Sequence, residues 1–213
     1  MPKILSPDDI ADFRDRLCDA AERLFADFGP DAVTIRQLAS AVGVSAMTPY
    51  RYFNDKDAIL AAVRARAFDR HAQALEDAYA ATPGDPRVRA AALGEAYIRF
   101  ALDHPHAYKL MFDIQQPSAG AYPDLVRAGE RSRATMTRHV RDMTEAGMIE
   151  GDPDMIGHLF WAALHGPLML HFSGMLDSRH NAQTLIRGLS AALWRSAVTP
   201  NPAAPPGGDH PPR

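Results

Sequence analysis

The sequence has one cysteine, Cys18, in 213 residues. A single thiol forms no intramolecular disulfide and cannot build a zinc site that needs several thiolates, so we expect a reducing compartment. No apolar run approaches the roughly 20 residues that a membrane-spanning helix needs. The first residues, MPKILSPDD, show no apolar stretch followed by a small-residue cleavage site. We therefore expect no signal peptide and a cytoplasmic protein.

The sequence also has little net charge and few β-strand signals. The formal net charge is −3, so any DNA-binding surface has to be a local basic patch on a mildly acidic chain. Apolar and polar residues do not alternate over any long stretch, and there is no Asn-Gly or Asp-Gly hairpin signal. Apolar residues make up 46% of the chain and recur at helical spacing. These features together predict an all-α fold.

The helical spacing, interrupted by glycine and proline, predicts about nine helices. The first carries an apolar stripe from Ile10 to Phe28 and ends at Gly29-Pro30, where proline cannot continue the hydrogen-bond ladder. The others are expected at about 34–43, 45–52, 54–82, 86–103, 105–113, 123–147, 153–174 and 179–197. The tail at 199–213 has six prolines and no large apolar residue, so we expect it to be disordered.

Residues 33 to 53, VTIRQLASAVGVSAMTPYRYF, have the spacing of a helix-turn-helix. Thr34 and Gln37 form the pattern of a capping box at the start of the first helix. Gly43 permits the backbone conformation of the turn, and Val44 fills the space between the helices. We expect Ser45 to cap the second helix and Asn54 to cap the long helix that follows.

The second short helix would expose small and polar side chains that suit the major groove. Thr48 can bond a base edge or a phosphate, and Arg36 on the preceding helix can reach a phosphate or a guanine. The side chains suited to phosphate contacts are Tyr50, Arg51, Tyr52 and Lys56. Residues 31–70 hold six basic and four acidic side chains, a balance of +2 against −3 for the whole chain. This balance is weak support, and three core helices without a DNA role are the alternative.

The stretch from about 10 to 70 resembles the DNA-binding domain of the TetR family of bacterial regulators. AAERLFADFGPDAVTIRQLASAVGVS and TPYRYFNDKDAIL carry the resemblance; the latter is similar to the family's pattern of a tyrosine, a second aromatic, phenylalanine, then lysine and a leucine pair. The resemblance implies a DNA-binding domain at 8–70, with its motif at about 33–53. Together with the exposed side chains above, it gives these DNA-contacting candidates: Thr34, Arg36, Ser45, Ala46, Met47, Thr48, Tyr50, Arg51, Tyr52 and Lys56.

One position departs from that pattern. Pro49 stands where the family usually has a branched apolar residue. As the fourth residue of the expected recognition helix, it removes a backbone donor near the first turn. The sequence does not show how this proline affects base readout.

The C-terminal half, 71–198, is expected to bind a ligand and to dimerise. The run from Trp161 to Gly166, and HPHAYKLMF at 104–112, resemble a Trp…His-Gly subgroup of the same family. Family members dimerise through their last two helices as a four-helix bundle. Here the apolar stripe for that packing is Leu159, Ala163, Leu185, Leu189, Ala192 and Leu193.

Pro167 should kink the first of these two helices and open space beside it. The side chains expected around a ligand there are Tyr97, Phe100, Tyr108, Met111, Phe112, Trp161 and His165. The alternative is that these residues are simply core.

The function that follows is a ligand-responsive repressor, released from a palindromic operator by a small molecule. A constitutive DNA-binding regulator without a ligand is the main alternative. A metal sensor using His158 and His165, or His104 and His106, lacks carboxylates at close spacing other than Asp103. A thiol sensor at Cys18 is disfavoured because that residue lies beside the apolar stripe. We expect no cofactor and no enzyme, since nucleotide loops, nucleophile elbows and HExxH motifs are missing.

Overall fold

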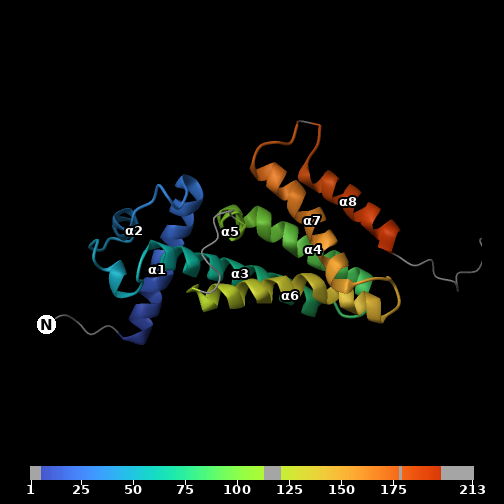
Figure 1. The fold of residues 1–213 in the computed structure, drawn as a ribbon, viewed down its shortest axis with the longest axis horizontal. Coiled ribbons are helices and arrows are strands. Elements are labelled where there is room, and N and C mark those ends of the chain that lie inside the picture. Colours follow the sequence, from blue (N-terminus) through green and yellow to red (C-terminus); the bar gives the residue numbers. More distant parts are fainter. Residues whose placement is uncertain (1–5, 113–120, 178, 198–213) are drawn as a thin grey trace, which may run out of the picture. The chain divides into compact units, whose positions relative to one another are not determined.

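The computed structural model describes residues 6–112, 121–177 and 179–197 (Figure 1). These residues form eight α-helices and a short 3-10 helix, with no β-strand, which confirms the all-α prediction. The helices are α1 (Pro7–Phe28), α2 (Ile35–Ala41), η1 (Pro49–Arg51), α3 (Lys56–Ala81), α4 (Pro86–Asp103), α5 (Pro105–Met111), α6 (Pro123–Glu145), α7 (Pro153–Phe172) and α8 (Ala182–Ala197). None of the helices in the described part is long and apolar enough to cross a membrane. The predicted tail at 199–213 lies outside the described residues.

Local capping explains where the first helices begin. Ser6 and Asp9 form a capping box, so α1 starts at Pro7, ahead of the apolar stripe that begins at Ile10. It ends at Gly29, whose φ of 83° suits glycine. The predicted box of α2 is confirmed: the Gln37 amide nitrogen donates to Thr34 Oγ1 at 3.3 Å, and the Thr34 amide nitrogen donates to Gln37 Oε1 at 2.8 Å.

The cap of α3 is one residue later than predicted. Asp55, not Asn54, accepts the hydrogen bond from the Ala58 amide nitrogen, at 2.7 Å. Asn and Asp are equally good N-caps, so two adjacent candidates could not be separated by residue type alone. The choice follows from the end of the preceding turn, which places Asp55 in an extended conformation.

The chain divides into two compact units, between Thr135 and Met136 inside α6. The expected functional division at 70/71 falls inside the continuous helix α3 and stays a prediction. In the first unit, α1, α2, α3 and α5 share a core built on Leu17, Phe25, Leu38, Ile59, Val63 and Leu110. A smaller cluster of Ala61, Ala65, Leu125 and Ala128 packs α3 against the start of α6.

In the second unit, α7 and α8 pack against each other as a hairpin (Figure 1). Gly157 of α7 lies so close to Thr137 of α6 that a Cβ atom would come within 2.8 Å of its methyl group. Pro167 is buried inside α7, and the predicted kink there stays a prediction. α8 starts later than expected, after Asn181, whose side chain accepts from the Thr184 amide nitrogen at 2.9 Å.

Candidate nucleic-acid interface

The turn after α2 has the predicted geometry. Gly43 has a φ of 73°, a left-handed conformation that favours glycine. The Val44 amide nitrogen then donates to the Ala39 carbonyl at 3.0 Å, and the half-buried Val44 side chain packs against the core of the first unit. This turn brings residues 45–53, which we name the reading turn, to the surface beside α2.

The reading turn is not the α-helix that was predicted over 45–52. Its amide groups at Thr48, Arg51 and Tyr52 each donate to the carbonyl three residues back, at 3.0–3.1 Å, which is 3-10 geometry. An α-helix beginning after Ser45 would need an N–H at position 49 to reach the Ser45 carbonyl. Pro49 has none, so the segment folds into successive tight turns and only η1 is regular.

The predicted cap by Ser45 is also wrong, because the helix it would cap does not form. Ser45 Oγ lies 2.9 Å from Thr48 Oγ1 instead, and η1 starts at Pro49 with no side-chain cap from its N-cap residue, Thr48. The two hydroxyls therefore pair with each other at the exposed start of the reading turn.

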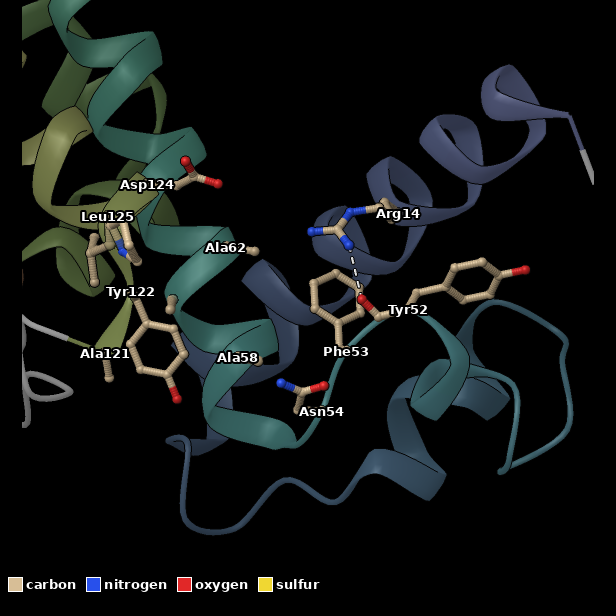
Figure 2. A pocket seen from close by; sticks show the side chains of 12 residues that line it. Arg14, Tyr52, Phe53, Asn54, Ala58, Ala62, Ala121, Tyr122, Asp124 and Leu125 are labelled. Carbon is tan, nitrogen blue, oxygen red and sulfur yellow. Dashed lines mark hydrogen bonds between the residues drawn. The ribbon is translucent and has the colours of Figure 1, made fainter.

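Contacts from α1 hold the far end of the reading turn in place. Arg14 Nη1 donates to the Tyr52 carbonyl at 2.8 Å, and its guanidinium carbon lies 4.3 Å from the centre of the Phe53 ring (Figure 2). The Phe13 and Tyr52 rings pack with centroids 4.7 Å apart. Phe53 itself is only 5% exposed. Sequence reasoning missed Arg14, since a contact spanning 38 residues leaves no local pattern.

Most of the predicted DNA contacts do lie at the surface. Met47 and Tyr50 are 70% and 50% exposed, and they are the two large hydrophobic side chains exposed on the reading turn. The exposed residues of the predicted set are Thr34, Arg36, Ser45, Ala46, Met47, Tyr50 and Arg51, and the half-buried ones are Thr48, Tyr52 and Lys56. Between α2 and the reading turn, Arg36, Val44 and Ala46 line an open hollow of about 510 Å³. Arg36 and Ala46 of the set thus meet at this hollow, and the DNA contacts of the whole set stay a prediction.

Two members of the set also have structural roles. The Tyr52 ring packs on Phe13, and Lys56 Nζ donates to the Pro30 carbonyl at 2.6 Å. Lys56 thereby ties the start of α3 to the loop before α2. Its ammonium has three donors, so this bond does not prevent a phosphate contact.

Three of the six basic residues counted between 31 and 70 form hydrogen bonds or ion pairs away from the reading turn. Arg64 is buried and its Nε donates to the Leu110 carbonyl at 2.9 Å. Arg66 forms ion pairs with Asp15 and Asp19, and Arg70 pairs with Glu22. Of the six residues counted, only Arg36, Arg51 and Lys56 therefore add positive charge near the reading turn, beside Arg14 of α1, and the balance of +2 included three side chains that do not.

Five of the seven predicted ligand contacts gather in the first unit. Tyr97 and Tyr108 are buried, with their hydroxyl oxygens 2.7 Å apart. The Phe112 ring lies 5.0 Å from that of Tyr108, and Phe100 and Met111 are buried on the same two helices, α4 and α5. Trp161 and His165 lie on α7 in the second unit, with ring centroids 6.0 Å apart. Partial burial lowers the pKa of His165.

His71 of α3 belongs to the same cluster and was missed. Its ring makes edge contacts with Tyr97 and Phe100 at 5.1 Å, and its Nδ1 lies 2.8 Å from Ser132 Oγ. Burial lowers the pKa of His71 to about 4, so the imidazole is neutral near pH 7. Its position four residues after Ala67 and four before Leu75, on the apolar stripe of α3, was the available signal.

No metal-binding group of three His, Cys, Asp or Glu side chains occurs among residues 6–112, 121–177 and 179–197. His106 Nε2 instead lies 3.3 Å from an Asp27 carboxylate oxygen, and His158 Nδ1 lies 2.6 Å from the Asp154 carbonyl. Cys18 is buried, and this burial raises the pKa of its thiol.

Comparison with known proteins gives two family matches. Residues 17–63 match the model for bacterial regulatory proteins of the tetR family, and residues 90–193 match a tetracyclin repressor-like C-terminal domain. An HTH-type transcriptional repressor of Mycobacterium tuberculosis is 39% identical over 72 residues, which is 34% of this chain and 38% of that repressor. The match thus spans well under two thirds of that relative.

Two solved structures extend the similarity to most of the chain. A protein of unknown function from a Rhodococcus species is 32% identical with a TM-score of 0.76, covering 93% of this chain and 100% of that one. A TetR family transcriptional regulator from Thermus thermophilus is 22% identical with a TM-score of 0.67, covering 85% of this chain and 98% of that one. At the lower identity the likeness shows the fold alone.

Proposed function

Because the chain belongs to the TetR family of bacterial regulators, we propose that it is a transcription repressor that binds operator DNA through α2 and the reading turn. The observation that carries this proposal is the exposure of Met47 and Tyr50 beside Arg36 and Arg51. Exposed apolar side chains that are rimmed by polar ones are typical of interaction surfaces. Arginine and tyrosine bind phosphates, and small side chains such as Ala46 allow close approach to base edges.

We propose further that the repressor is a homodimer formed through α7 and α8. Leu159 of α7 and Leu189 of α8 are each 46% exposed, as unpaired dimer faces would be. A two-fold dimer would place two reading turns in successive major grooves of a near-palindromic operator. Such a regulator would act in the cytoplasm.

A small molecule would release the protein from DNA. The cluster around His71, Tyr97 and Tyr108 supports a site for it, because it combines aromatic surface with buried polar atoms. The ligand must prefer the arrangement that does not bind DNA. A differential affinity of about 2.7 kcal/mol would give a roughly 100-fold loss of operator binding.

The DNA-binding claim is tested with purified protein and the DNA upstream of its own gene, across a salt series. We expect affinity to fall steeply with salt, and an Arg36→Ala, Tyr50→Ala double variant to lose at least about tenfold. A matched control, Arg87→Ala with Val88→Ala on α4, also removes one exposed basic and one exposed apolar side chain. Full binding by the first variant would refute the proposed placement.

A constitutive regulator without a ligand is the second candidate. The observation in its favour is that Tyr97 pairs with Tyr108 and His71 Nδ1 pairs with Ser132, as in an ordinary core, although the buried Nε2 of His71 has no hydrogen-bond partner among the described residues. Titration of small aromatic compounds against operator-bound protein separates the two. Release by any of them supports the sensor, and its complete absence supports the constitutive regulator.

A further inference from the structure

A cleft of about 210 Å³ opens in the first unit between α3, the end of the reading turn and the start of α6 (Figure 2). We name it the head cleft. Phe53 lies on one side and Tyr122 on the other, with Ala58 and Ala62 of α3 between them. Its volume is below the 300–1,000 Å³ of pockets for drug-sized ligands, so it suits a smaller molecule.

The cleft exists because of how α3 and α6 pack. Ala61, Ala65 and Ala128 let the two helices approach, and Leu125 fills the contact. α6 begins at Pro123, only one residue from Tyr122, so no further turn of α6 covers Ala58 and Ala62. Small side chains on the floor and aromatic rings at both sides leave a slot for a flat molecule.

The electrostatics of the slot favour a cation. Asp124 lies on the rim, where its ion pair with Arg127 is exposed to solvent and therefore exchangeable. The carboxylates of Asp55 and Asp57 place negative potential near Tyr122, and burial together with these two charges raises the pKa of the Tyr122 hydroxyl. The one basic side chain in the lining, Arg14, keeps its charge but is held on the Phe53 side by its bond to the Tyr52 carbonyl, so a cation has to lie on the Tyr122 side (Figure 2).

We propose that the head cleft is a second ligand site, which binds a small planar aromatic cation of the amidine or amino-heterocycle class. The ring would lie against Tyr122 and the alanine floor, and the charge would face Asp124. Aromatic faces and a carboxylate both attract such a cation, whereas a neutral molecule of the same shape gains only the stacking.

A cation bound in the head cleft would also affect the reading turn. Arg14 lines the same cleft, so a bound cation would repel its guanidinium and weaken its bond to the Tyr52 carbonyl. This step alone rests on the proposed DNA-binding function. Binding of the cation itself does not.

The test uses the full-length protein without DNA and two probes of equal shape, benzamidine and its neutral isostere benzamide. Backbone amide shifts in an isotope-labelled sample locate the site. For a probe of about nine non-hydrogen atoms we expect benzamidine to bind with a Kd on the order of 0.1–1 mM and to shift amides near Phe53, Ala62 and Tyr122. Benzamide should bind at least about fivefold more weakly.

Variants assign the binding to the cleft. Ala62→Leu should fill the slot and abolish binding, whereas Ala74→Leu, an equally half-buried alanine farther along α3, should leave it unchanged. Asp124→Asn should reduce the affinity for benzamidine to that for benzamide. No saturable shift up to about 10 mM benzamidine, equal binding of benzamide, or full binding by Ala62→Leu would overturn the proposal.

A final measurement adds operator DNA. Benzamidine should weaken operator binding by the native chain and not by Ala62→Leu. If benzamidine binds the cleft but the protein binds no operator DNA, the proposed ligand site stands and the proposed repressor function fails. Operator binding that is unaffected by a saturated cleft would remove only the coupling through Arg14.

Discussion

α2 and the reading turn are adjacent and similar in length, yet they are stabilised in different ways. α2 is stabilised by residues of its own segment. Thr34 and Gln37 accept hydrogen bonds from each other's backbone amide groups, and Leu38 packs into the core. The reading turn has a proline inside it and no side-chain cap at η1. Its position depends on Arg14 and on the burial of Phe53.

This difference shows which part of the proposed DNA-binding surface depends on contacts from other elements of the fold. A short helix is marginal by itself, and the reading turn, whose one α-helical bond runs from the Phe53 amide nitrogen to the Pro49 carbonyl, is weaker still. α2 should therefore respond to changes in its own sequence. The reading turn should respond to changes in α1, 38 residues earlier in the chain.

The largest effect is expected from a variant that removes the anchor of the reading turn. Phe53→Ala removes a ring that is 5% exposed and should lower the free energy of unfolding by about 3–5 kcal/mol, through lost burial and the cavity left behind. Urea unfolding measures it. Phe28→Ala, at a ring that is 64% exposed, is the matched control and should change stability by less than about 0.5 kcal/mol. Equal costs at the two positions would show that Phe53 is not an anchor.

Arg14→Ala tests the tie from α1 directly. It removes the bond to the Tyr52 carbonyl and the stacking on Phe53, so we expect a loss of about 1–2 kcal/mol in stability. Operator affinity should fall by roughly tenfold although Arg14 is assigned no DNA contact. Arg16→Ala, an exposed arginine two residues on, removes the same charge without these contacts. If both variants lose affinity equally, the effect is one of general charge and not of the tie.

The same contrast separates what could be predicted from the sequence from what could not. The predictions of the box at Thr34 and Gln37 and of the turn at Gly43 are right because their interactions are made within three to five residues. The helix over 45–52 was wrong because the family pattern outweighed Pro49, whose missing N–H decides the local hydrogen bonding.

The contacts that sequence reasoning missed are long-range. Arg14 reaches a carbonyl 38 residues away, and His71 reaches Ser132 across 61 residues. Nothing in the local pattern specifies either partner. The gathering of Tyr97, Phe100, Tyr108, Met111 and Phe112 could be anticipated because α4 and α5 are neighbours in sequence and share apolar periodicity.

A variant with a smaller expected effect tests whether α2 is stabilised by its own capping residues. Thr34→Ala removes the side-chain half of the capping box and should cost about 1 kcal/mol of unfolding free energy. Thr34→Ser keeps the hydroxyl and should retain most of it. Amide hydrogen exchange should rise at the first turn of α2 and stay unchanged in the reading turn. Increased exchange in both segments would mean that they form one cooperative unit, and the contrast between them would fail.

Pro49→Leu should change stability least and local structure most. Leucine restores the N–H at position 49, so the Ser45 carbonyl can accept an α-helical bond, and its side chain keeps apolar contact at this buried position. Stability should change by less than about 1 kcal/mol, because proline near a first turn costs far less than proline in a helix interior. Cα chemical shifts over residues 46–52 should become helical. If the shifts stay as in the native chain, the contacts of Arg14 and Phe53, and not the missing N–H at position 49, impose the 3-10 geometry. Long-range contacts would then decide even the local hydrogen bonds of the reading turn.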